Sequence, residues 1–248
     1  MTIFYFTGTG NSLAVAKKIG GNLISIPKVV DGENLHYKDD VIGVVFPIYV
    51  FTPPGMVSRF LEKAKLEADY TFAIGTYGNM ALSTMSNLQK KMKTKDFDYL
   101  NEILMVDNFL NIFEMNSQIA KIPKKKIDEK LSQIISDIQN RKRMDTNPSC
   151  ICKDIFTSII TALPFNKNAP KYIVNDNCTK CDICTKVCPA HNITVKDNVT
   201  FGNDCEKCYA CIHLCPQNAI HLKSERSNKR WRHPDVSLSE IIEANNRG

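Results

Sequence analysis

The sequence predicts a doubly wound α/β domain with a five-stranded parallel sheet, followed by a small α+β domain rich in cysteine. Apolar segments of strand composition alternate with helical patterns over residues 1–145, as in parallel sheets covered by helices. Eight of the ten cysteines then lie between positions 178 and 215. We therefore expect one domain at 1–145 and a second at 171–222, separated by a connector at 146–170 and followed by a basic tail at 223–248.

Five segments of the first domain have the composition of buried strands. They are short runs rich in branched and aromatic residues, at 1–6, 23–26, 41–46, 70–75 and 100–106. Helical patterns follow four of these strands, at 13–19, 56–65, 81–93 and 127–143. In the strand order 2-1-3-4-5, the loops after strands 1, 3 and 4 meet at the switch point where doubly wound sheets bind ligands.

The loop after the first strand has the features of a phosphate site. It connects a strand to a helix start and reads Thr7-Gly8-Thr9-Gly10-Asn11-Ser12. Backbone N–H groups at a helix N-terminus bind anions, and hydroxyl groups add hydrogen bonds. A Walker loop requires lysine where Asn11 stands. A dinucleotide fingerprint requires a third small residue where Leu13 stands. A lysine-free phosphate loop and an ordinary βα turn with polar caps both remain open.

The loops after the third and fourth strands are candidates for holding a flat ring system. One contains two aromatic residues and reads Pro47-Ile48-Tyr49-Val50-Phe51. The other contains a glycine, which lets backbone amides approach a flat ligand closely, and reads Thr76-Tyr77-Gly78-Asn79. The alternative for Tyr49 and Phe51 is packing under the helix that follows them.

The cysteines of the second domain form an internal repeat, offset by 27 residues from Cys178 to Cys205. Each half has three cysteines at two-residue spacings and a fourth that precedes proline. This run is typical of proteins with two [4Fe–4S] clusters, in which the fourth cysteine ligates the other cluster. We therefore assign one cluster to Cys178, Cys181, Cys184 and Cys215. The second cluster is assigned to Cys205, Cys208, Cys211 and Cys188.

Two alternatives for these cysteines are disfavoured. Structural zinc also uses Cys-x2-Cys pairs, but zinc sites do not require this run with proline, repeated twice. Disulfides need an oxidising compartment, and the start of the chain lacks the features of a signal peptide. We expect a cytoplasmic protein in which Cys150 and Cys152 are free thiols. With the cluster ligands complete, His191, His213 and His221 are expected at exposed positions, as structural or solvent-facing residues.

The whole chain resembles the flavodoxin–ferredoxin fusion proteins of anaerobic bacteria and archaea. The resemblance rests on the cysteine repeat and on the segments Phe6–Ser12, Pro47–Tyr49 and Thr76–Asn79. It implies a flavodoxin-like domain whose three loops bind FMN, with an aromatic residue of the Pro-x-Tyr loop against the flavin ring. It also implies a bacterial ferredoxin-type domain with two [4Fe–4S] clusters. Residues 107–170 are poorly covered, and part of them could line the flavin pocket or an interdomain surface.

The formal charge of +6 invites a nucleic-acid interpretation, because basic residues gather in the tail beside the single tryptophan, Trp231. Two oxidised clusters and a flavin phosphate would together contribute about −6, so the loaded protein would be close to neutral. We therefore expect no nucleic-acid partner. The tail is expected to pack across the acidic cofactor region or to form a docking patch. No apolar run approaches the roughly 18 residues that a membrane span needs.

Two functions remain open from the sequence. The favoured one is an electron-transfer protein that passes single electrons between the clusters, a bound FMN and other redox proteins or a reductase. The alternative is an FMN-dependent oxidoreductase that acts on a small substrate and receives electrons from the ferredoxin domain. A redox sensor or scaffold is a third, weaker class. An enzyme requires an open cavity over the flavin, whereas a carrier requires a cofactor edge near a flat surface.

Overall fold

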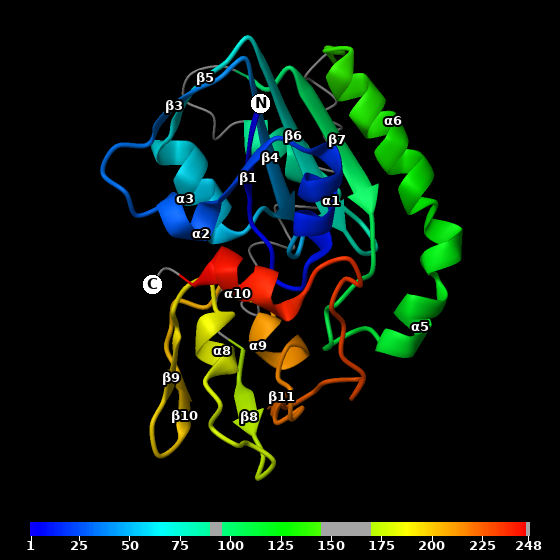
Figure 1. Cartoon of the computed structure of the whole chain (residues 1–248). Helices are drawn as coiled ribbons and strands as arrows, with labels where there is room; N and C mark the ends of the chain where they lie inside the picture. Colours follow the sequence, from blue (N-terminus) through cyan, green and yellow to red (C-terminus); the bar gives the residue numbers. More distant parts are fainter. Residues whose placement is uncertain (90–95, 145–169, 247–248) are drawn as a thin grey trace.

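The α/β domain and the cysteine-rich domain lie one above the other, with the C-terminal helix between them (Figure 1). The computed structural model describes residues 1–89, 96–144 and 170–246. Most of the expected connector, together with Cys150 and Cys152, lies outside the described residues. So does the end of the helix expected at 81–93.

Five parallel strands form the central sheet of the α/β domain. They are β1 (Thr2–Tyr5), β2 (Asn22–Ser25), β4 (Val41–Pro47), β6 (Tyr70–Tyr77) and β7 (Tyr99–Leu104). Their order is β2-β1-β4-β6-β7, so the prediction of a five-stranded parallel sheet in this order is confirmed. Phe4 in the centre pairs with Ile24 on one side and Val44 on the other. The central strands are apolar on both faces because helices cover both faces.

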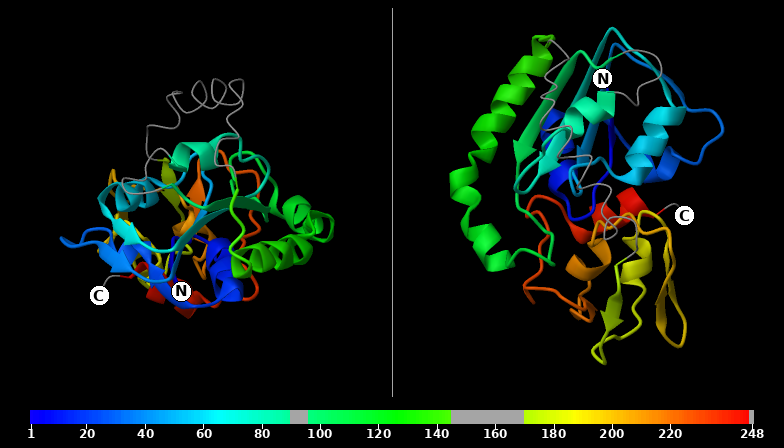
Figure 2. Two further views of the ribbon diagram at one scale, coloured as in Figure 1. Left: turned by 90° about the horizontal axis from the view of Figure 1, so that it is seen from above. Right: turned by 180° about the vertical axis from the view of Figure 1, so that it is seen from behind.

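The helices of this domain are α1 (Asn11–Ile19), α2 (Ile26–Val29), α3 (Gly55–Lys63), α4 (Thr84–Gln89), α5 (Met115–Ala120), the 3₁₀ helix η1 (Ile122–Lys125) and α6 (Ile127–Gln139). Helix α1 lies on one face of the sheet and α4 on the other (Figures 1 and 2). Several helix boundaries differ from the prediction, since α1 begins at Asn11, α4 begins at Thr84 and α6 ends at Gln139. Helix α3 ends at Lys63 rather than at residue 65. Lys65 belongs to strand β5 (Lys65–Glu67), which pairs with β3 (His36–Lys38), because Ala64 has extended backbone angles that end α3.

The cysteine-rich domain is a structural repeat as well as a sequence repeat. Strand β8 (Tyr172–Val174) pairs with β11 (Ile220–Leu222), and β9 (Ile193–Val195) pairs with β10 (Val199–Phe201). The short helices α8 (Ile183–Lys186) and α9 (Ala210–His213) lie at the same 27-residue offset. Left-handed backbone positions recur at that offset in three pairs, Lys180 and Lys207, Asp182 and Tyr209, and His191 and Asn218.

The tail packs between the two domains. It passes through Trp231, whose exposed fraction is 8%, and ends in helix α10 (Leu238–Asn245). Ser237 and Glu240 form a capping box that starts this helix. Ile241 is buried, whereas Ile242 is only partly buried. The exposed basic residues of the tail are Lys223, Arg226, Lys229 and Arg232.

The hydrophobic cores of the two domains are continuous with each other. The main core contains the sheet and also Cys208, Leu214 and Ile241 from the second domain and the tail. The smaller core of the second domain contains Val106 and Leu110 from the first. Shared burial of this kind holds the domains in one arrangement. Among the described helices, none combines the length and hydrophobicity that crossing a membrane requires.

Candidate functional site

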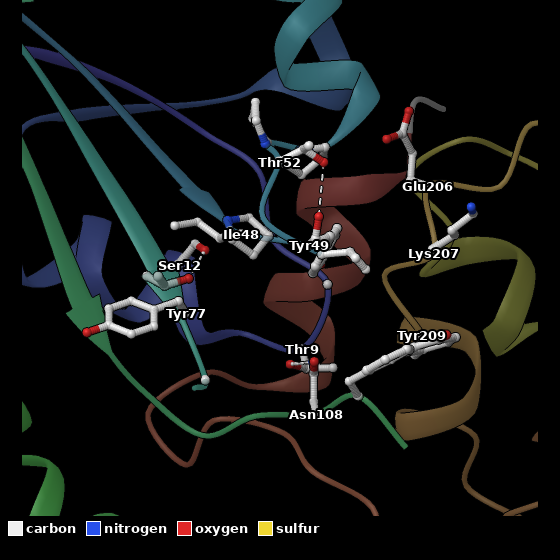
Figure 3. A pocket seen from close by; sticks show the side chains of 18 of the residues that line it. Thr9, Ser12, Ile48, Tyr49, Thr52, Tyr77, Asn108, Glu206, Lys207 and Tyr209 are labelled. Carbon is white, nitrogen blue, oxygen red and sulfur yellow. Dashed lines mark hydrogen bonds between the residues drawn. The ribbon is translucent and has the colours of Figure 1, made fainter. Parts of the chain in front are cut away.

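A cavity of about 1480 Å³ lies between the carboxyl ends of the central strands and the cysteine-rich domain (Figure 3). The three predicted loops come together in its wall, through Thr7, Gly8, Thr9, Asn11, Ser12, Pro47, Ile48, Tyr49, Val50, Phe51, Thr76, Tyr77, Gly78 and Asn79. Gly10 does not line the cavity. A Cβ at Gly10 would lie 3.0 Å from Cβ of His233, so this residue faces the tail instead.

The phosphate-loop end of the cavity is rich in hydrogen-bond donors. The first N–H groups of α1 have no partner inside the helix, which makes this end a site for an anion. Thr7 Oγ1 accepts from the N–H of Gly10 at 3.1 Å, and Thr9 Oγ1 accepts from Nδ2 of Asn108 at 2.8 Å. Both threonines act as acceptors in these bonds, so each keeps its hydroxyl hydrogen for a ligand.

The tail holds this loop from behind. Trp231 Nε1 donates to Oδ1 of Asn11 at 3.0 Å, and the N–H of His233 donates to the carbonyl of Thr9 at 2.9 Å. Asn245 Nδ2 donates to the carbonyl of Thr7 at 3.2 Å. Three carbonyl or amide oxygens of the loop are therefore bonded away from the cavity. This arrangement leaves the N–H groups facing it and fixes their positions before a ligand binds.

The loop after β4 is a tight turn with unusual backbone angles. Tyr49 and Thr52 exchange two backbone hydrogen bonds, of 2.9 and 3.1 Å. The two residues between them, Val50 and Phe51, have φ angles of 46° and 65°, in the left-handed region. A branched residue such as valine rarely adopts this conformation, which costs on the order of 1–3 kcal/mol. The surrounding structure therefore imposes the shape of this turn, which forms one wall of the cavity.

The loop after β6 packs directly against the end of the fifth strand. A Cβ at Gly78 would lie 2.2 Å from Cβ of Asp107, so only glycine fits there. Lys125 Nζ donates to the carbonyl of Gly78 at 2.9 Å and to that of Met105 at 2.5 Å. Burial raises the pKa of Asp107, opposed by the N–H of Phe109 and the charge of Lys125. Burial lowers the pKa of Lys125, because it disfavours the charged form of the amine.

Asp107 and Asn108 line the cavity but were not among the predicted site residues. The signal for them was present, because they directly follow the fifth strand, at the edge of the sheet where ligands bind. The expectation that the region after residue 107 lines the pocket is met by these residues and by Phe109.

The second domain supplies the opposite wall of the cavity, through Cys205, Glu206, Lys207 and Tyr209. The carboxylate of Glu206 accepts from the N–H of Met56 at 3.1 Å and from Arg59 at 3.2 Å, and so caps the start of α3. The ring of Tyr209 stacks on that of Phe109 with centroids 5.9 Å apart. These contacts could not be read from the sequence, because they depend on how the two domains meet.

Gly8 brings the first predicted loop into contact with the second domain. A Cβ at Gly8 would lie 2.9 Å from the carbonyl oxygen of Cys208 and 2.9 Å from the hydroxyl of Tyr49. Tyr49 lines the cavity as well. Its hydroxyl end is buried, and the pKa of Tyr49 is raised, first by burial and then by the neighbouring thiol of Cys208.

The pKa values of the thiols respond to neighbours in both halves of the repeat. Burial raises the pKa of Cys184 to about 11, and the neighbouring thiols Cys215, Cys178 and Cys181 raise it further. Burial also raises the pKa of Cys208, and the thiols of Cys188, Cys205 and Cys211 raise it further. In both cases one neighbour, Cys215 for Cys184 and Cys188 for Cys208, comes from the opposite half of the repeat. All eight are free thiols, with none in a disulfide.

Backbone N–H groups point at several of the sulfurs. The N–H of Asn192 lies 3.4 Å from Sγ of Cys188, and that of Ala219 lies 3.3 Å from Sγ of Cys215. Such bonds favour the thiolate form that binds iron. In the described residues, no group of His, Cys, Asp or Glu is arranged for a single metal ion. A cubane differs in this respect, since its four thiolates bind four separate iron atoms.

The three histidines expected at exposed positions differ in exposure: His191 is exposed, His221 is partly buried and His213 is buried. The prediction was wrong for His213, which is 5% exposed because both ring nitrogens have partners inside the protein. Its Nε2 lies 2.9 Å from the carbonyl of Asn108, and its Nδ1 accepts from the N–H of Trp231 at 3.1 Å. Burial lowers the pKa of His213 to about 4, so the ring is neutral. It connects the cysteine-rich domain, the tail and the cavity wall.

Comparison with known proteins identifies one part of the chain. Residues 177–220 match the family model of the 4Fe–4S dicluster domain, and this range contains all eight cysteines of the repeat. The crystal structure of a candidate flavoprotein from Bacteroides eggerthii DSM 20697 is similar at 19% identity. The match covers 51% of this chain and 97% of the flavoprotein chain. Its TM-score of 0.33 does not establish a shared fold. No curated protein matches the chain.

Proposed function

We propose that this protein transfers single electrons between two [4Fe–4S] clusters, a bound FMN and external redox proteins, in the cytoplasm. The observation that carries the proposal is the composition of the cavity wall. One side consists of the three predicted flavin loops, and the other contains Cys205, a predicted cluster ligand. A cofactor in this cavity would lie next to the second proposed thiol set, because Cys205 belongs to that set.

The residues proposed to hold the clusters are the two thiol sets. They are Cys178, Cys181, Cys184 and Cys215 for the first cluster, and Cys205, Cys208, Cys211 and Cys188 for the second. When bound, FMN exchanges one or two electrons and each cluster exchanges one. The sets differ in exposure, since Cys181 is exposed whereas Cys208 and Cys211 are each 7% exposed. The first set thus faces solvent, where a partner protein can approach, and the second faces the cavity.

The residues proposed to hold FMN fit its two chemically different ends. The hydroxyls of Thr7 and Thr9 and the N-terminus of α1 suit the phosphate, and they do so without a lysine. The loop after β6 is proposed to lie along the ring, because Tyr77, Gly78 and Asn79 line the cavity. The proposed division of the chain is a flavin domain at 1–145, a cluster domain at 171–222 and the tail at 223–248.

One observation favours the second candidate, an FMN-dependent oxidoreductase. The cavity of about 1480 Å³ exceeds the roughly 300–1000 Å³ of most small-molecule sites, so it has room beside a flavin. Its rim includes Met80 and Ile112, which are 51% and 55% exposed. An apolar rim of this kind suits a flat apolar substrate that accepts electrons.

The test is anaerobic reconstitution of the full chain with iron, sulfide and FMN, followed by measurement of bound iron and flavin. The proposal predicts about eight irons and one FMN per chain. Protein that binds neither would overturn both candidates. Turnover of NAD(P)H or a quinone by the loaded protein would favour the enzyme, and one-electron exchange without turnover would favour the carrier.

A glycine variant separates flavin binding from cluster binding. Gly78→Ala places a Cβ where Asp107 stands, so we expect FMN affinity to fall by at least tenfold while iron content is unchanged. Gly20→Ala is the control, because nothing lies within 4 Å of its added Cβ and it is outside the cavity wall. Equal flavin affinity in both variants would place the flavin elsewhere.

A further inference from the structure

The two halves of the cysteine repeat differ in the side chains that accompany their sulfurs. Tyr172 in β8 and Val199 in β10 are equivalent at the 27-residue offset. Their pairing partners are equivalent too, since Tyr172 pairs with Leu222 and Val199 with Val195. The same backbone position therefore carries a hydroxyl group in one half and a purely apolar side chain in the other.

The hydroxyl of Tyr172 lies 3.1 Å from Sγ of Cys205. Its ring stacks on that of Phe201, with centroids 4.3 Å apart and planes 23° apart. Phe201 is itself half of an unequal pair, because Val174 occupies its equivalent position in the repeat. The strand pairing and the ring stack together fix the tyrosine, so the hydroxyl is held at the sulfur before any cluster is loaded.

The direction of this hydrogen bond follows from the chemistry of the ligand. A cysteine that ligates iron is a thiolate without a proton, so the tyrosine hydroxyl must donate. A donor at a cluster sulfur stabilises the reduced, more negative state more than the oxidised state, and so raises the reduction potential.

One backbone donor is common to both sets. Asn192 donates to Cys188 and Ala219 donates to Cys215, so each thiol set receives one equivalent N–H bond. Cys205 receives two further donors, the hydroxyl of Tyr172 and, at 3.3 Å, the N–H of Lys207.

We propose that Tyr172 is a positioning residue that raises the reduction potential of the cavity-side cluster above that of the solvent-side cluster. An electron taken from an external one-electron reductant then resides mainly beside the cavity. The O–H bond of Tyr172 stays intact, so no proton accompanies this electron. The inference rests on the proposed function, and specifically on a cluster ligated by Cys205.

The test is a redox titration of the reconstituted protein, followed by electron paramagnetic resonance, with dithionite as reductant. Tyr172→Phe removes the hydroxyl and keeps the ring for the stack with Phe201. We expect about a tenfold change in the distribution of the electron between the clusters, equivalent to about 59 mV for a one-electron couple. The reduction potential that falls in Tyr172→Phe must belong to the cluster that the Cys208→Ala variant lacks. The iron content of Tyr172→Phe must equal that of the wild type.

Tyr209→Phe is the matched control. Its hydroxyl also lies near the cavity-side sulfurs, but it donates to Oδ1 of Asn111 at 3.0 Å, so we expect neither potential to move. An unchanged potential in Tyr172→Phe, an equal shift of both clusters, or the same shift in Tyr209→Phe would each overturn the proposal.

An isosteric replacement decides the matter if Tyr172→Phe fails to retain its iron. Replacing Tyr172 by 3-fluorotyrosine keeps the shape and provides a more acidic, stronger donor. The potential of the cavity-side cluster should then rise, and an unchanged or lower potential would overturn the proposal. Wild-type protein that binds no iron would instead overturn the proposed function, and this assignment with it.

Discussion

The two halves of the cysteine repeat have the same spacing and the same backbone, yet they occupy different environments. In the first half, Cys181 and its neighbours Lys180 and Asp182 are exposed. In the second half, Cys208, the equivalent of Cys181, is 7% exposed and packs in the core of the α/β domain. The cause lies in the spacer residues rather than in the cysteines. The repeat duplicates a ligand set, and its spacers determine which set faces the cavity.

Two spacer positions account for much of this difference. Glu206 caps helix α3 of the α/β domain, and its equivalent in the first half is the exposed Thr179. Tyr209 stacks on Phe109, and its equivalent is Asp182. Substitutions at equivalent positions of the two halves are therefore natural pairs of variant and control.

The largest expected effect is on the crossing of ligands between the halves. Cys215→Ala combined with Cys181→Ala should remove one cluster and leave about four irons, because both residues belong to the same set. Cys215→Ala combined with Cys208→Ala should remove both clusters. Iron analysis after reconstitution distinguishes the two double variants, and Cys150→Ala should retain about eight irons. The reverse pattern would show that each half holds its own cluster.

The contact between the phosphate loop and the second half gives the next largest effect. In Gly8→Ala the added Cβ meets the carbonyl of Cys208, so we expect a loss of about 1–3 kcal/mol in unfolding free energy and at least tenfold weaker FMN binding. Urea unfolding and flavin titration measure the two quantities. Gly20→Ala, whose φ is +89° with nothing nearby, should lose about 1 kcal/mol through backbone strain and bind FMN normally. Normal flavin binding by Gly8→Ala would show that the flavin does not contact this loop.

The spacer comparison itself is tested by Glu206→Ala against Thr179→Ala. Removing Glu206 leaves the start of α3 without its cap and Arg59 without its partner, which should cost about 1–2 kcal/mol. Replacing the exposed Thr179 by alanine should lower the unfolding free energy by less than about 0.5 kcal/mol. Unfolding of the two reconstituted variants in urea gives both values. Equal losses of unfolding free energy in the two variants would mean that both halves of the cysteine repeat are attached equally to the α/β domain.

The smallest effect concerns helix α10 in the tail. Asn245 Nδ2 of this helix donates to the carbonyl of Val187, in the first half of the cysteine repeat, at 3.0 Å. Glu240 in this helix pairs with Lys17 at 2.6 Å, and that contact and Ser237 lower the pKa of Glu240 from 4.5 to about 2. The stabilisation that the ionised Glu240 provides is therefore complete above about pH 4.5, and it is lost as the pH falls toward 2. The stability difference between wild type and Glu240→Gln should be constant from pH 7 to 5 and shrink below that range. A difference that grows on acidification would contradict this assignment.

The sheet and the loop positions could be predicted from the sequence because they depend on local patterns. Runs such as 41–46 are apolar on both faces, which only a central parallel strand requires. The loops then follow from the rule that ligands bind at the carboxyl ends of such strands. The crossed thiol sets are predicted from spacing alone, and the iron analysis of the double variants tests them.

The remaining features depend on contacts between distant segments, and no local pattern encodes them. His213 was expected at an exposed position because it is polar, but Asn108 and Trp231 satisfy its nitrogens from two other parts of the chain. The role of Glu206 requires the start of α3 beside it. Helix α3 ends before Lys65 because that residue pairs with a strand almost thirty positions earlier.

The hydrogen bond between Asn245 and Thr7 spans 238 positions of the chain, and it has a consequence for biosynthesis. At about 5–20 residues per second, the ribosome takes on the order of 10–50 s to reach the tail after releasing the phosphate loop. During that interval the loop lacks the bonds from Trp231, His233 and Asn245. The cysteine-rich domain is synthesised before these residues. The cavity beside this loop is therefore completed last, after all eight cysteines of the repeat have been synthesised.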